Sequence, residues 1–247
     1  EQYHLNEYGA YKFDIHPIGT ICHELGHVLG LPDLYDTSVN SAAGIGEWGL
    51  MGSGNYLSQT SPAYMSAWSR YRLGFIDPVI LENKVDHFLT IHPAEYSVGD
   101  RAFILPLDSN MPHEYILLEN RQRLGSDIHL AGTGMLAWHI DESITDMSPA
   151  IKYVNVNPDF YGVNLLQADG DEVLYEADLN NNCYYCEADD GDPFPGVTGN
   201  TQLAGWTSPS TDIYNYDRDG DGTVDVGGES GISIRSIEEN SNDEITC

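Results

Sequence analysis

The sequence contains few cationic residues. It holds 10 Lys and Arg against 39 Asp and Glu, which gives a formal net charge of −29 over 247 residues. A field of that sign repels nucleic acid and anionic lipid, so the charge excludes both as expected partners. Long apolar runs are absent too, since none approaches the ~18 residues that a membrane span needs. The excess of acidic over basic residues is typical of an extracellular protein or of one that binds cations.

Cysteine is also scarce. The chain has four, namely Cys22, Cys183, Cys186 and Cys247. Cys183 and Cys186 form a C-x-x-C pair, but a four-cysteine zinc site needs a second such pair, and the sequence has none. A site of that kind is therefore excluded. A local disulfide and free thiols both stay open for this pair.

Two stretches near the start have the apolar spacing of helices. Residues 17–30 carry apolar side chains at 18, 21, 25, 28 and 29, with a proline in the first turn and a glycine at the end. Residues 62–73 carry Ser61 as a candidate N-cap, Pro62 at the first position, and Gly74 as a stop. The spacing predicts a helix over each stretch.

Beyond residue 77 the pattern changes to short apolar runs divided by Pro, Gly and Asn. Residues 87–93, 101–107, 114–122, 134–140 and 231–237 are typical of strands, and from about Asn155 the Asp, Asn and Gly content favours loops. The expected fold class is therefore mixed α/β of the α+β kind. We expect one domain with a helical part over residues 1–76 and a β-rich part over residues 77–247.

The segment "TICHELGHVLGLPDLYD", residues 20–36, carries the chemistry. His23 and His27 stand four apart, so a helix puts both imidazoles on one face, where each can bind the same ion. Glu24 is rotated about 100° from His23, too far to be a first ligand but well placed beside a bound water. A catalytic zinc takes three protein ligands and one water, whose pKa falls to about 7. This pattern predicts peptide-bond hydrolysis with Glu24 as general base and then acid.

The third zinc ligand has two candidates. Asp33 lies six residues past His27, and Gly30 allows the backbone to reverse and bring Asp33 back to the ion. Glu47 lies twenty residues past His27, a spacing used when a second helix supplies the ligand. The segment between them has little helical pattern, so we favour Asp33 over Glu47.

Two further residue types near this segment have candidate roles. Met51 stands in the Gly-rich stretch "EWGLMGSGNY", and a methionine turn below a zinc site is the Met-turn of metzincins, although methionine is also a common core filler. Tyr56 or Tyr35 could hydrogen-bond the oxyanion of the reaction, and we favour Tyr56 as the catalytic tyrosine.

A second metal is predicted in the segment "DRDGDGTVD". Counted from Asp217, the calcium-loop positions 1, 3, 5, 7 and 9 are Asp217, Asp219, Asp221, Thr223 and Asp225, and a glycine stands at the turn position 6. Position 12 is a glycine, not the usual glutamate, so the loop is EF-like and not a strict EF-hand. We expect structural Ca²⁺ here, and Asp189, Asp190 and Asp192 are candidates for holding a second ion.

"HELGHVLGLPDLYD" and "WGLMGSGNY" resemble the secreted metallopeptidases of the immune inhibitor A type, a metzincin-like group. "EYILLENRQ", "GTGMLAWHIDE", "VNLLQADGDE" and "GDPFPG" follow in the order that such proteins show. The resemblance implies a secreted zinc endopeptidase, made as a precursor and acting on proteins, with His23, His27 and Asp33 as ligands and Glu24 as base.

The resemblance also implies a missing part. Members of the group carry an upper half before the zinc helix, with a sheet whose edge pairs with substrate. We therefore expect this chain to be the C-terminal part of a catalytic domain, whose N-terminal part or pro-segment is a partner. Two other functions compete: an inactive or latent fragment serving as a calcium-bound scaffold, and a zinc hydrolase or carbohydrate-associated module with a non-protein substrate.

Overall fold

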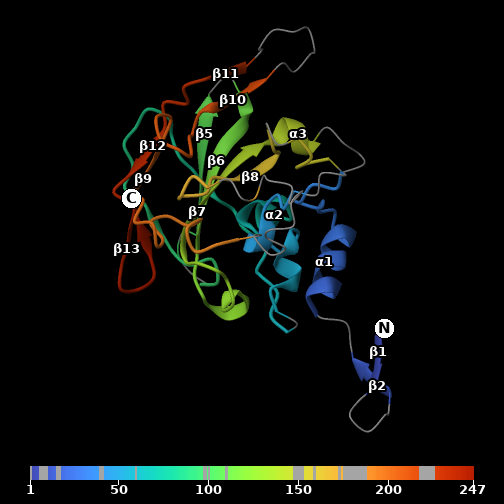
Figure 1. The fold of residues 1–247 in the computed structure, drawn as a ribbon. Coiled ribbons are helices and arrows are strands. Elements are labelled where there is room, and N and C mark those ends of the chain that lie inside the picture. The colour runs from blue at the N-terminus through green and yellow to red at the C-terminus, as the bar shows by residue number, and fades with distance from the viewer. Residues whose placement is uncertain are drawn as a thin grey trace.

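The computed structural model is built around a five-stranded sheet (Figure 1). It describes residues 2–5, 11–14, 18–38, 42–58, 60–96, 99, 101–108, 111–146, 153–157, 160–171, 174, 188–216 and 226–247. The strands stand in the order β3-β5-β6-β7-β8, with bounds Val79–Ile80, Ala102–Asp108, Met111–Arg121, Gly134–Asp141 and Val163–Leu165. β3 pairs parallel with β5, and the other neighbours pair antiparallel. The strands predicted over 101–107, 114–122 and 134–140 are confirmed.

Both faces of this sheet are covered, and alternate residues along its strands enter two separate cores. In β7 all eight residues are buried. One core takes Leu117, Leu136 and Trp138 from the sheet together with apolar residues of the first 76 positions. The other takes Ile116, Leu118, Met135 and Ala137 together with apolar residues from positions 203–245. The period of two in a strand therefore divides the chain into a helical layer and a C-terminal β layer on opposite faces of one sheet.

The remaining described elements are short. The other strands are β1 (Gln2–Leu5), β2 (Tyr11–Asp14), β4 (Thr90–Ile91), β9 (Gln202–Ala204), β10 (Ile213–Tyr216), β11 (Val226–Gly228), β12 (Ser233–Arg235), β13 (Glu238–Glu239) and β14 (Ile245–Thr246). The helices are α1 (Ile18–Val28), α2 (Ala67–Arg72) and α3 (Glu142–Asp146), with 3₁₀ turns η1 (Gly46–Trp48), η2 (Ser53–Tyr56) and η3 (Gly125–Asp127). β4 and β12 confirm the strands expected within 87–93 and 231–237. Mixed α and β structure is confirmed, and the few helices beside several sheets are compatible with the α+β kind.

The helix α1 is where the sequence predicted it, but its apolar stripe does not enter the core. Ile18, Ile21, Leu25, Val28 and Leu29 are 43% to 80% exposed. The residues of α1 that are buried have small or polar side chains and are Gly19, His23 and Gly26. A Cβ at Gly19 would lie 1.9 Å from the Asn55 carbonyl oxygen, so the helix meets η2 at Gly19. The apolar stripe of α1 therefore lies on the side of the helix opposite to the one that contacts η2.

The predicted start of the second helix is wrong. α2 begins at Ala67 and not at Pro62, and its N-cap is Ser66, whose hydroxyl accepts a hydrogen bond from the Ser69 N–H at 3.3 Å. Before Ser66 the backbone makes a hydrogen bond outside the helix: the Tyr64 N–H donates to the Asp127 carboxylate at 2.7 Å. That acceptor lies 63 residues away, which local spacing does not reveal. The predicted end is confirmed, since Gly74 adopts φ +69°.

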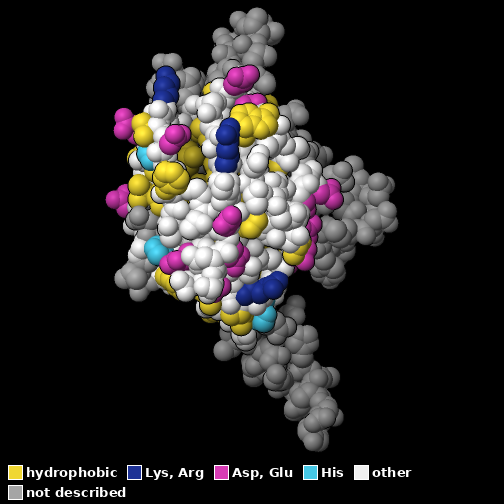
Figure 2. Space-filling model, turned by 90° about the vertical axis from the view of Figure 1, so that its left-hand side faces the viewer, with side chains coloured by type: hydrophobic (Ala, Val, Ile, Leu, Met, Phe, Trp, Pro, Cys, Tyr) yellow, Lys and Arg dark blue, Asp and Glu magenta, His cyan; other side chains and the backbone are white. Residues whose placement is uncertain are grey.

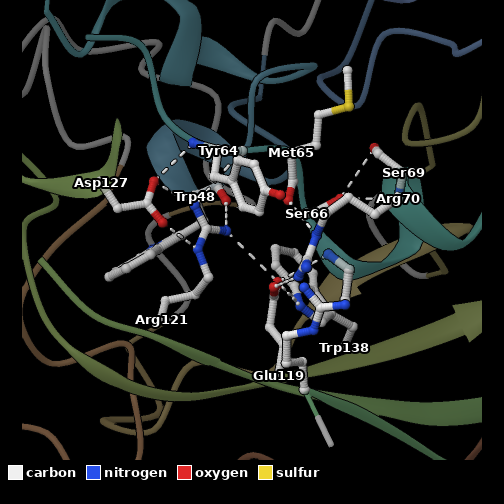
Figure 3. Close-up of polar contacts among 12 residues, drawn as sticks. Trp48, Tyr64, Met65, Ser66, Ser69, Arg70, Glu119, Arg121, Asp127 and Trp138 are labelled. Carbon is white, nitrogen blue, oxygen red and sulfur yellow. Dashed lines mark hydrogen bonds and ion pairs between the residues drawn. The ribbon is translucent and has the colours of Figure 1, made fainter. Parts of the chain in front are cut away.

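A buried polar network joins α2 to the sheet (Figure 3). Arg70 donates to Glu119 of β6 at 2.6 Å, and both side chains are almost fully buried. The other Glu119 oxygen accepts from the Ala67 N–H at 3.0 Å and from the Trp138 indole N–H at 2.9 Å. The Glu119 carboxylate thus meets donors on both oxygens, which offsets the cost of burying a charge.

Arg121 extends this network to the segment that follows α1. Its guanidinium donates to both carboxylate oxygens of Asp127, at 2.6 and 2.8 Å, and to the Trp48 carbonyl at 2.7 Å. Arg121 and Asp127 are 0% exposed. A bidentate pair of this kind holds one geometry. The network therefore fixes η1 and the residues after it against β6.

Glu95 lies against Asp127, and both Glu95 oxygens are buried. Two neighbouring carboxylates repel unless one holds a proton and donates it to the other. Burial, followed by the hydrogen bond to Asp127, raises the pKa of Glu95 from 4.5 to about 8. Asp127 keeps a lowered pKa against its own burial, because Arg121 stabilises its charge. In the folded protein Glu95 therefore keeps its proton at neutral pH.

We predict a pH dependence from this carboxyl pair. Between pH 4.5 and about 8 the folded state holds a proton on Glu95 that the unfolded chain releases, so stability falls as the pH rises through that window. Glu95→Gln keeps a donor and cannot titrate, so its free energy of unfolding is expected to vary less with pH. Urea titrations across the window measure this, with the exposed Glu82→Gln as control. An unchanged slope for Glu95→Gln would contradict the prediction.

The surface agrees with the charge balance of the sequence. On the face drawn in Figure 2, basic side chains are few and isolated, and acidic side chains are spread over it. Among the described residues, no helix has both the length and the apolar character to cross a membrane.

Candidate metal centre

Two histidines of α1 form the centre of the site. His23 and His27 lie one turn apart, with ring centroids 4.8 Å apart and ring planes at 90°. His23 is 5% exposed and His27 is partly exposed. The helical spacing of four thus places both rings on one face, as the sequence predicted.

Backbone carbonyl groups fix the orientation and the tautomer of each imidazole ring. His23 Nδ1 lies 2.8 Å from the Leu50 carbonyl oxygen, and His27 Nδ1 lies 2.9 Å from the Leu31 carbonyl oxygen. A carbonyl only accepts, so each Nδ1 carries a hydrogen, and Nε2 is the nitrogen that becomes free to bind a metal once it holds no proton. This is the tautomer that a metal-binding imidazole needs.

Asp33 completes a group of three. Its Oδ1 lies 3.1 Å from His23 Nε2 and 3.2 Å from His27 Nε2, and the donor atoms of all three residues lie within 4.8 Å of one another. Gly30 adopts φ +102°, which allows the chain to reverse after the helix. Glu47, the alternative third ligand, lies in η1 and is not a member of this group. The structure therefore brings together the three residues favoured from the sequence.

The electrostatics of this group fit a cation. Two nitrogen lone pairs and a carboxylate oxygen converge, and acceptors facing one another repel unless a proton or a metal ion lies between them. The hydrogen bond to Asp33 raises the pKa of His23 against the effect of burial. Burial alone would raise the pKa of Asp33, but hydrogen bonds from His23 and Tyr35 lower it. Two imidazoles and one carboxylate are also a donor set that zinc uses in catalytic sites.

Glu24 and Met51 differ in exposure and in what they contact. Glu24 is exposed, and its charge acts on His23 and on Tyr35, so it stands at the edge of the site. Met51 is 1% exposed and its Sδ would lie 2.4 Å from a Cβ added at Gly26. The methionine therefore packs directly beneath the helix turn that joins the two histidines.

We predict that the close approach of Met51 makes Gly26 sensitive to substitution. Gly26→Ala should reduce the free energy of unfolding by about 1–3 kcal/mol, the usual effect of overpacking. Chemical denaturation measures this, with Thr20→Ala on the same helix as control. The variant Gly26→Ala/Met51→Ala should lose less than the sum of its two single changes, because the smaller side chain removes the clash. Strict additivity would contradict the contact.

The two candidate tyrosines occupy different places. Tyr35 makes a hydrogen bond to the Asp33 carboxylate, and burial together with that bond raises the pKa of Tyr35 to about 12. Its ring stacks on His23, with centroids 6.4 Å apart and planes at 21°. Tyr56 lies in η2 and is 71% exposed. The sequence offered both tyrosines for one role, and residue spacing alone does not reveal the contact of Tyr35 with Asp33.

The acidic segments are only partly described. The predicted calcium loop, residues 217–225, and the pair Cys183 and Cys186 lie outside the described residues. Asp169, Asp189 and Asp192 bring carboxylate oxygens within 4.8 Å of one another, whereas the exposed Asp190 is not a member of that group. Burial raises the pKa of Asp192 to about 6, and the Trp48 indole donates to it at 2.7 Å. The sequence did not predict Asp169 as a member of this group, because it lies 20 residues before Asp189 in the chain.

Fold and site together define a mixed α/β protein with a His–His–Asp candidate metal centre, formed by two histidines of α1 and an aspartate that follows this helix. Residues 2–80 match the family model for the immune inhibitor A peptidase M6 catalytic domain. The resemblance to that family is confirmed for this stretch, which supports a metallopeptidase. The later motifs that we compared with the family lie beyond the matched residues and stay a prediction.

Two relatives from strains of Vibrio cholerae serotype O1 have similar sequences. Each is described as the pre-pro-metalloprotease PrtV and is 35% identical to this chain over 72 residues. The matched stretch covers 26% of this chain and only 8% of the length of each relative. No solved structure matches the chain significantly.

Proposed function

We propose that this protein is a secreted zinc-dependent endopeptidase that hydrolyses peptide bonds in proteins. The convergence of His23 Nε2, His27 Nε2 and Asp33 Oδ1 within 4.8 Å carries the proposal. These three residues would hold one zinc ion, and the family match over residues 2–80 supports a metallopeptidase.

Zinc, when bound, lowers the pKa of a water to about 7 and polarises a carbonyl group. The residues around it would handle the proton and the charge. Glu24 is exposed beside His23 and would accept the proton of the attacking water, then donate it to the leaving amine. Tyr56 is exposed enough to donate a hydrogen bond to the carbonyl oxygen of a bound peptide. The Nδ1 bonds of both histidines keep the rings in place.

The finer fold assignment is part of the proposal. We infer a zincin-like lower subdomain of the metzincin kind, in which Met51 forms the floor of the site. Its burial against Gly26, next to the Leu50 carbonyl that accepts from His23, supports this role.

The proposal extends to partners. Substrates would be proteins or peptides, and a further N-terminal part of the catalytic domain or a pro-segment would cover α1. The exposed apolar stripe supports a covering element, because a face with five exposed apolar side chains is typical of a contact surface. The word "pre-pro" in the name of the relatives supports a secreted precursor. Nucleic acid and membrane are not proposed as partners.

Calcium remains a proposal from sequence alone. We expect Ca²⁺ at Asp217, Asp219, Asp221, Thr223 and Asp225, because carboxylates at this spacing repel one another without a cation. Its role would be structural, in a part of the chain rich in loops.

Casein hydrolysis tests the proposed function. Turnover should be lost with 1,10-phenanthroline, persist with the non-chelating 1,7-phenanthroline, and return when Zn²⁺ is added to the dialysed sample. This follows because the general base acts only on a water that the metal activates. Zinc binding without turnover would instead favour the latent fragment, for which the exposed stripe of α1 is the supporting observation. Turnover insensitive to 1,10-phenanthroline would contradict the proposal.

A further inference from the structure

We propose that Tyr35 is a positioning residue that holds the Asp33 carboxylate in the orientation needed to bind the metal. The inference rests on the proposed function, because it concerns the third ligand of the same zinc site. It assigns Tyr35 a role different from that of Tyr56, with which it was grouped as a candidate for the oxyanion.

The contacts of Tyr35 are those of a support for the site. Its hydroxyl makes a hydrogen bond to the Asp33 carboxylate. Its ring stacks on His23 with centroids 6.4 Å apart, and the side chain is only partly exposed. One residue thus touches two of the three candidate ligands, the carboxylate through its hydroxyl and the imidazole through its ring.

Asp33 needs such support more than the histidines do. Both histidines stand on α1 and are oriented by backbone carbonyls. Asp33 stands after the helix, in a segment without regular structure. The next residue is fixed, because the Leu34 N–H donates to the Met51 carbonyl at 2.9 Å and the Leu34 carbonyl accepts from the Ile45 N–H at 2.9 Å.

With the backbone at Leu34 held in this way, the torsions of the Asp33 side chain are the main freedom left. The hydroxyl of Tyr35 restricts them and leaves Oδ1 between the two Nε2 atoms, at 3.1 and 3.2 Å. Partners that orient a ligand typically change metal affinity 10- to 100-fold when they are removed. We therefore expect the hydroxyl of Tyr35 to act on zinc affinity and not on the reacting peptide.

Zinc affinity of the purified protein tests this assignment. Competition with a chromophoric chelator would give the dissociation constant for Zn²⁺ of the wild type, Tyr35→Phe and Tyr56→Phe. We expect Tyr35→Phe to bind zinc about 10- to 100-fold more weakly and to recover turnover in excess zinc. We expect Tyr56→Phe to bind zinc as the wild type does and to lose turnover even when saturated. Tyr35→His, whose ring still offers an N–H donor, should regain part of the affinity.

Thermal unfolding of the metal-free variants provides the control for folding, because Tyr35→Phe removes a single oxygen and should leave the metal-free midpoint close to that of the wild type. Wild-type zinc binding within twofold for Tyr35→Phe would overturn the inference while leaving the metal centre intact. Failure of the wild type itself to bind one zinc would overturn the proposed function, so the two failures are distinguishable.

Discussion

Replacing Glu24 with alanine is expected to abolish most of the hydrolysis of casein while leaving zinc bound. The carboxylate is exposed and is not a member of the ligand group, so its loss should alter neither the fold nor the metal site. A general base typically contributes 10²- to 10⁴-fold, so kcat/KM should fall by at least about 10²-fold. Casein turnover and zinc content, measured on the same sample, give both quantities.

A second exposed glutamate provides the control for this change. Glu82→Ala removes the same charge far from α1 in the sequence and should keep both activity and zinc. Glu24→Gln keeps the size of the side chain and should be as inactive as Glu24→Ala, because an amide does not accept the proton. Full activity in either Glu24 variant would refute the mechanism.

Replacing Arg121 with methionine is expected to produce the largest loss of stability. The guanidinium is 0% exposed and makes two hydrogen bonds to Asp127 and one to the Trp48 carbonyl. Removing one partner of a buried ion pair leaves the other charge uncompensated and typically costs about 3–5 kcal/mol. Urea unfolding followed by tryptophan fluorescence measures the loss.

A surface arginine gives the matched comparison. Arg72 is 45% exposed and lies 3.8 Å from Glu142, so Arg72→Met should cost about 1 kcal/mol or less. Arg121→Met/Asp127→Leu removes both buried charges and should recover part of the stability lost in Arg121→Met. A cost below about 1 kcal/mol for Arg121→Met would contradict the assigned role of the network.

The sheet was predictable because its signal is local. The runs that became β5, β6 and β7 are continuous or alternating apolar segments bounded by turn residues, and each pairs with its neighbour in the chain. α2 was mispredicted at its start because distant groups decided it, above all the Asp127 carboxylate that takes the Tyr64 N–H. Apolar spacing also predicted the existence of α1 but not which face is buried, since close approach at Gly19 and Gly26 decided that.

In the candidate site, too, the features set by local sequence were predictable and those set by distant residues were not. The spacing of His23, His27, Gly30 and Asp33 is local, so helix geometry and one chain reversal were enough to bring the ligands together. The supporting contacts come from elsewhere in the chain. The Leu50 carbonyl reaches His23 from 27 residues away, and the Arg121 guanidinium holds Trp48 from 73 residues away. Such contacts carry no signature in one sequence, because they depend on how the layers pack.

The number of zinc ions bound per chain tests the central claim most directly. Elemental mass spectrometry of the purified wild type, Asp33→Ala and Glu47→Ala would compare the two candidates for the third ligand. We predict one zinc per chain in the wild type and in Glu47→Ala, and a large loss of zinc in Asp33→Ala. Full zinc in Asp33→Ala, with its loss in Glu47→Ala, would contradict the assignment of the centre.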